Sequence, residues 1–143
     1  MSRSSFKERT FAAAIGVAIL LGSTVANAGG DRFECRSSAP GEDASIDARF
    51  EDDSDRMKFS ASFEAAPGGS FGTGDMLGVT VDGYLVAVMQ LSGTAPGDVT
   101  GDVNFDTTAQ VDDADAPFPA NFPATGAGTN VLVGTFGCTL QAR

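Results

Sequence analysis

Apolar and polar residues alternate along two neighbouring stretches of the chain. Positions 46, 48 and 50 are apolar and are separated by charged residues, and residues 57–63 repeat the same period of two. A period of two is typical of half-buried β-strands. The acidic residues 52–55 lie between the two stretches, so the pattern predicts a β-hairpin with an acidic turn.

A second hairpin is predicted at the dipeptide Asp82-Gly83. Apolar runs flank it on both sides, and Asp-Gly favours a type I′ turn because both of its central residues need a positive φ. The second arm is apolar on both faces over residues 85–89. We therefore expect this arm to be a central strand that is covered on both sides.

The rest of the chain also reads as short strands with turns between them. Residues 102–106 alternate again, and residues 130–140 form the last predicted strand. No stretch after residue 28 has a convincing helical period. Evenly spaced strands separated by Gly, Pro and Asp predict an all-β fold, a single antiparallel β-sandwich of about seven or eight short strands. A small β-barrel is the alternative.

The N-terminus has the order of a secretory signal peptide. Basic residues precede an apolar run at residues 11–21, and the small residues Ala26 and Ala28 bracket Asn27. We expect residues 1–28 to be removed and residues 29–143 to form the sandwich domain, in the periplasm or outside the cell. The apolar run is too short to cross a bilayer, which takes about 20 residues, so membrane insertion is not expected.

Two cysteines remain after this cleavage, one near each end of the mature domain. An even pair in an exported protein is read as a disulfide. We therefore expect Cys35 and Cys138 to be bonded, which closes the sandwich by tying its first strand to its last.

The charge of the chain is strongly negative and unevenly distributed. The net charge of −10 becomes −12 for the mature domain, because the leader contains three basic residues and one acidic residue. Between residues 59 and 142 there is no Lys or Arg. Binding to nucleic acid depends on clustered basic residues, so nucleic acid is excluded as a partner. A cation or a basic protein is the partner that this charge favours.

The residue types argue against most catalytic machinery. Without any His, neither a Ser-His-Asp triad nor a His-based zinc site is possible. Carboxylates are plentiful, so a hydrolase that uses a pair of them stays open as an alternative. Residues 103–109 resemble the apolar-Asp-Thr-Gly-Ala turn of aspartic proteases, although Thr108 stands where that family has glycine.

An acidic stretch in the second half of the chain is a candidate calcium site. Residues 98–106 resemble the front half of an EF-hand or dockerin-type loop, but Val103 replaces the turn glycine and Ala109 replaces the closing acid. A complete EF-hand is therefore rejected, and a looser site or a solvated acidic edge remains. The candidate ligands are Asp98, Asp102, Asn104, Asp106, Asp112, Asp113 and Asp115.

A proline-rich segment follows, residues 117–123, with Phe118 and Phe122 between its prolines. The two rings either bind a partner or pin a long crossover onto the sandwich. Together these observations predict an exported, non-enzymatic β-sandwich that serves as a binding or structural module, with an acidic loop that engages a cation or a basic partner. The alternative is a small carboxylate-based hydrolase that acts outside the cytoplasm.

Overall fold

The computed structural model describes residues 30–39, 41, 43–94, 96–108 and 115–143. These residues form nine β-strands and no helix. The strands are β1 (Asp31–Ala39), β2 (Ala44–Asp53), β3 (Arg56–Ala65), β4 (Met76–Val81), β5 (Tyr84–Gln90), β6 (Val99–Asp106), β7 (Asn130–Val133), β8 (Phe136–Thr139) and β9 (Gln141–Ala142).

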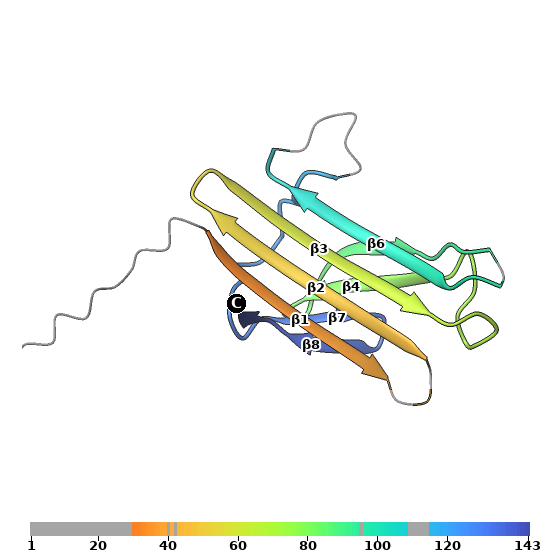
Figure 1. Ribbon diagram of the computed structural model, residues 1–143. Coiled ribbons are helices and arrows are strands. Elements are labelled where there is room, and N and C mark those ends of the chain that lie inside the picture. The colour runs from red at the N-terminus through yellow and green to blue at the C-terminus, as the bar shows by residue number, and fades with distance from the viewer. Residues whose placement is uncertain (1–29, 40, 42, 95, 109–114) are drawn as a thin grey trace, which may run out of the picture.

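The strands form two antiparallel sheets that face each other (Figure 1). One sheet has five strands in the order β6-β3-β2-β1-β9, and the other has four in the order β5-β4-β7-β8. The all-β sandwich predicted from the sequence is thereby confirmed. The two sheets do not close into one barrel, so the barrel alternative is wrong.

The hairpin β2–β3 forms the centre of the five-stranded sheet, as the alternating pattern predicts. Its register pairs Ile46 with Phe63 and Phe50 with Phe59, and all four side chains are buried. Every second residue between them points outward and is polar. Burial of the apolar set fixes this register, because a slip of one residue would expose the entire set.

Phenylalanine rings supply much of the interior. Phe63 contacts Phe71 and Phe136 at ring-centroid distances of 4.9 and 5.7 Å, which joins the two sheets across the core. Phe33 stacks on Phe50 at 6.3 Å within the five-stranded sheet. Such ring pairs stabilise a core beyond the area that they bury.

The predicted disulfide is present. Cys35 of β1 and Cys138 of β8 are bonded with an S–S distance of 2.04 Å and a Cα–Cα distance of 5.7 Å. Because β1 and β8 belong to different sheets, the bond ties the two layers together at one side of the sandwich. It closes a loop between residues that are 103 positions apart.

The turn at Asp82-Gly83 also agrees with the prediction. Both residues have positive φ, 47° and 82°, and they connect β4 to β5. The carboxylate of Asp82 accepts a hydrogen bond from the backbone N–H of Asn130 at 2.9 Å. The turn is therefore also tied to the start of β7.

The expected central position of residues 85–89 is wrong. Strand β5 lies at the edge of the four-stranded sheet and pairs only with β4. Val86 and Met89 are buried, but Leu85 and Val88 are more than half exposed. The pattern correctly showed that β5 is apolar on both faces, but this chain covers only one of them.

The last predicted strand, residues 130–140, is a hairpin instead. Strands β7 and β8 pair with each other around a turn at Gly134 and Thr135, where Gly134 has φ +60°. Val133 and Phe136 are both buried although they lie three positions apart, which a single strand with a period of two does not allow. This change of phase is visible in the sequence.

Candidate functional site

The outer face of the five-stranded sheet carries the positive charge of the described chain. Its six basic residues come from β1, β2, β3 and the C-terminal residue, and each makes an ion pair with a carboxylate on the same face: Arg32, Arg36, Arg49, Arg56, Lys58 and Arg143. The sequence places five of them before residue 59, and pairing of β9 with β1 brings the sixth beside them. This face is therefore a network of compensated charges.

Glu34 lies at the centre of three of these ion pairs. Nitrogen atoms of Arg32, Arg49 and Arg143 lie 2.5, 3.0 and 3.3 Å from its carboxylate oxygens. Partial desolvation raises the pKa of Glu34, but the hydrogen bond and charge of Arg32, with the charges of Arg49 and Arg143, bring the pKa below its ordinary value. Glu34 is held as an anion and has a structural role.

Asp106 is the most thoroughly enclosed carboxylate of this face, with a side chain only 1% exposed. Arg56 Nε donates to both carboxylate oxygens at 3.0 Å, Arg56 Nη2 also donates to Oδ2, and Lys58 Nζ lies 3.6 Å from Oδ2. The backbone N–H and the hydroxyl of Thr108 donate to Oδ1 at 2.8 and 2.9 Å. Chiefly because of the hydrogen bond from Arg56, the pKa of Asp106 lies far below its ordinary value, although desolvation opposes this.

This arrangement bears on the hydrolase alternative. A general acid or base must exchange a proton near the working pH. Asp106 is the carboxylate of the protease-like string, and its five donated contacts favour the ionised form near neutral pH. Its geometry is that of a structural ion pair.

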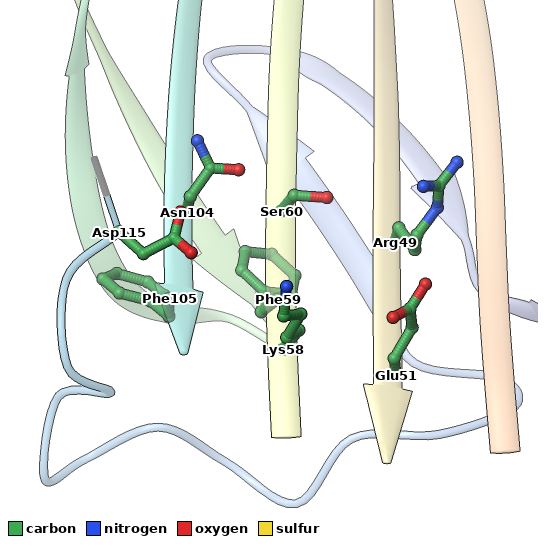
Figure 2. Close-up of a pocket in the computed structure, with 8 residues that line it drawn as sticks. All are labelled: Arg49, Glu51, Lys58, Phe59, Ser60, Asn104, Phe105 and Asp115. Carbon is green, nitrogen blue, oxygen red and sulfur yellow. The ribbon is translucent and has the colours of Figure 1, made fainter. Parts of the chain in front are cut away.

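A hollow of about 200 Å³ lies beside this ion pair on the outer face (Figure 2). Arg49, Glu51, Lys58, Ser60 and Asn104 project into it from β2, β3 and β6, and Asp115 closes one side. The lining contains both signs of charge, and both cations pair with other carboxylates. The hollow suits water molecules better than a ligand of fixed charge.

Four of the five described calcium candidates lie along one strand, and the fifth, Asp115, lies beside Asn104 at the hollow on the outer face. Asp98 precedes β6, Asp102 and Asn104 lie within it, and Asp106 ends it. Side chains on one face of a strand recur about every 6.8 Å, whereas oxygen ligands lie about 2.3–2.6 Å from a calcium ion. These residues therefore do not gather around one point, and Asp106 is occupied by Arg56.

Asp112 and Asp113 lie outside the described residues. Within the described ranges, no group of three or more Cys, Asp or Glu side chains is arranged to hold a metal ion. A calcium site that uses the acidic segment stays a prediction.

Phe118 and Phe122 lie on the crossover that connects β6 to β7, and both rings pack against the core. Phe122 lies 5.2 Å from Phe59 and 4.8 Å from Phe118, and Phe118 lies 5.7 Å from Phe105, measured between ring centroids. The two rings are half-buried. One side of each ring anchors the crossover, and the other side is available to line a pocket.

That pocket has a mainly apolar lining. Its volume is about 440 Å³, within the range of about 300–1,000 Å³ that is usual for small-ligand sites. It opens at the end of the sandwich, between the crossover and the β2–β3 hairpin. Its lining residues are Phe50, Asp52, Met57, Phe118, Pro119, Phe122, Pro123, Ala124 and Thr125. We call it the end pocket.

Four exposed carboxylates lie at the end of the sheet where the end pocket opens. Asp52 lines it, Asp31 is the cross-strand neighbour of Asp52 on β1, and Asp53 and Asp55 belong to the adjoining turn. All four are exposed, and none of them makes an ion pair with any residue that the structure describes. Like charges opposite each other on neighbouring strands are destabilising, so Asp31 and Asp52 cost the fold stability. We call these four residues the acidic rim.

The sequence alone indicates about half of this site. It singled out Phe118 and Phe122 and identified 52–55 as an acidic turn. It did not connect the two, because they are more than 60 positions apart and meet only when the crossover folds back over the end of the sheet. Met57 breaks no pattern in the sequence, but in the structure it is 37% exposed and lines the pocket together with Pro119 and Pro123.

Comparison of the chain with protein-family models, with curated proteins and with solved structures gave no match. Within the part of the chain that the structure describes, there is no helix with the length and apolar character needed to cross a membrane.

Proposed function

We propose that this protein is an exported, non-enzymatic β-sandwich that binds a basic partner through the end pocket and the acidic rim. The observation that carries the proposal is the joining of an apolar pocket of about 440 Å³ to four carboxylates that have no cationic partner within the described chain. A partner segment with a large apolar side chain flanked by Lys or Arg matches both features.

The two features have different roles in binding. An apolar side chain of the partner displaces water from the rings of Phe118 and Phe122 and from Met57, which supplies affinity. The rim attracts cationic groups, which raises the association rate and sets the orientation. The same negative charge repels nucleic acid and anionic lipid surfaces.

The proposed setting is the periplasm or the extracellular medium, after removal of residues 1–28. The signal-like N-terminus supports this setting, and so does the Cys35–Cys138 bond, because disulfides persist in oxidising compartments. The ionised, arginine-bound state of Asp106 supports a binding role over the hydrolase alternative.

A titration with short peptides tests the proposal. The probe is a pentapeptide with a central phenylalanine flanked on each side by two lysines, and the readout is the NMR signal of the Met57 methyl group. We expect saturable shifts that weaken as NaCl is added, because salt screens the rim. Replacing the peptide's phenylalanine by alanine should weaken binding by about tenfold or more, since an apolar anchor is lost.

Matched variants separate the two features. Ala124→Trp fills the end pocket and should abolish the shifts, whereas Ala120→Trp lies on the same crossover outside the pocket and should preserve them. Asp52→Asn with Asp53→Asn should weaken binding and reduce its salt dependence, and Asp98→Asn should change neither. Equal binding by a peptide with glutamates in place of lysines, or binding by Ala124→Trp, would show that the proposal is wrong.

A further inference from the structure

The four-stranded sheet has no charged residue in any of its strands. This holds for β4, β5, β7 and β8, in a chain with 28 charged residues among its 143. The five-stranded sheet, in contrast, carries all of the ion pairs described above. The outer face of the four-stranded sheet is therefore electrically neutral, and the outer face of the other sheet is densely charged.

The neutral face is also apolar and open. Met76, Leu85 and Val88 are 59%, 56% and 52% exposed. The register places Met76 beside Gln90, Gly78 beside Val88 and Thr80 beside Leu85, so these side chains share the outer face. Leu85 leans over Gly78, where its Cδ1 lies 3.2 Å from the place that a Cβ would take. Grouped exposed apolar side chains of this kind mark interaction surfaces.

We propose that a second copy of this chain packs face to face on the outer face of β4 and β5. Residues 85–89 are apolar on both sides, a pattern typical of strands that are covered on both, and the core of one chain covers one side only. With a net charge of −10, two copies repel each other wherever their acidic surfaces meet. The neutral face lets two copies approach without that repulsion, and a two-fold axis matches it to itself.

Pairing of β5 edges between two copies is a less suitable geometry. Val86 has no partner in the register between Val79/Ala87 and Thr80/Leu85, and such a bulge twists the edge. In addition, the side-chain amide of Asn121 lies 3.5 Å from the Leu85 carbonyl oxygen and donates to it. The outer face, rather than the edge, is the surface left open.

The area of this face indicates how tightly the two copies should bind each other. Strands β4, β5, β7 and β8 have 6, 7, 4 and 4 residues, and at about 3.4 Å per residue and about 4.8 Å between strands they give a face of roughly 340 Å². Stable interfaces bury about 800 Å² on each partner, so we expect a dimer that forms at high micromolar concentration. This range lies within reach of sedimentation experiments.

Sedimentation velocity of the oxidised protein from about 10 µM to about 1 mM tests the proposal. We expect a shift from monomer to dimer over this range. Leu85→Glu with Val88→Glu should raise the dissociation constant by about 100-fold or more, because like charges then meet in an apolar contact. Ser38→Glu, an exposed strand position on the charged sheet, should leave the dissociation constant unchanged.

A second measurement on the unaltered protein guards against a folding defect in the double variant. The methyl signals of Met76, Leu85 and Val88 should shift with protein concentration, while that of buried Ile46 should not. A monomer at 1 mM, or a dimer that persists in the folded double variant, would overturn the proposal. Because the end pocket lies elsewhere on the sandwich, neither result depends on peptide binding there.

Discussion

The acidic side chain of Asp106 has a structural role in this fold. Its carboxylate pairs with Arg56, and only 1% of the side chain is exposed. The hydrogen bonds of Arg56 and the charge of Lys58 offset the cost of burying this carboxylate. The charge of Asp106 is therefore a structural requirement.

We predict that Asp106→Asn lowers the stability of the sandwich in a manner that depends on pH. The pKa of Asp106 is lowered in the folded state, so its contribution is fully present above its unfolded pKa of about 3.9 and is lost as the pH falls towards the folded value. Urea melts from pH 7 to pH 2.5 measure the free energy of unfolding of wild type and variant. The difference between the two should be constant above pH 5 and should become smaller below pH 4. A gap that widens on acidification would contradict this account.

Gly101 permits a close approach between β6 and the buried end of β5. A Cβ at this position would lie 2.6 Å from Cγ of Met89 and 2.8 Å from Cδ2 of Leu91. We predict that Gly101→Ala destabilises the protein by about 1–3 kcal/mol, because Met89 and Leu91 must shift within a packed core. Chemical denaturation measures this loss, and Gly97→Ala in the preceding turn serves as a comparison outside the core. Equal stability of wild type and Gly101→Ala would contradict the proposed close packing.

At the scale of the elements, β1 and β8 are held together by the disulfide. For a loop of about 100 residues the chain-entropy account gives about 4–5 kcal/mol. We predict that the double variant Cys35→Ala, Cys138→Ala loses about 4 kcal/mol in the free energy of unfolding, measured by guanidinium melts. The wild-type protein under reducing conditions should behave in the same way, and a loss below about 1 kcal/mol would show that other contacts hold the two sheets together.

The crossover between β6 and β7 is held by its phenylalanines. Phe122 contacts the rings of Phe59, Phe105 and Phe118. We predict that Phe122→Ala costs about 3 kcal/mol, the low end for a buried ring because this one is half-buried. Thermal melts compare it with Ala120→Ser on the same crossover, which should be neutral. If Phe122→Ala has the stability of wild type, the crossover is held by other residues.

The elements also show what the sequence can predict. The hairpins at 52–55 and 82–83 follow from local alternation and turn chemistry, and both are present. The place of β5 at a sheet edge does not follow, because alternation reports which faces are apolar and not what covers them. The end pocket could not be predicted from the sequence for a related reason. Met57 and Phe118 line one pocket only because the crossover folds back over the sheet.

At the scale of the whole molecule, the two sheets divide the surface by charge. One outer face is a network of ion pairs, the other is neutral, and four exposed carboxylates lie where the end pocket opens. Part of the net negative charge of the chain therefore lies beside the end pocket, on the acidic rim. We propose that this distribution directs a basic partner to the end pocket and leaves the neutral face for a second copy.

Selection from a random peptide library displayed on phage tests the central claim most directly, because it assumes no partner sequence. With the oxidised wild-type protein as bait, we predict enrichment of peptides that carry a large apolar residue flanked by Lys or Arg. The same selection on Ala124→Trp should lose this enrichment, and Ala120→Trp should retain it. Enrichment of acidic or uncharged sequences, or equal enrichment on Ala124→Trp, would contradict the account.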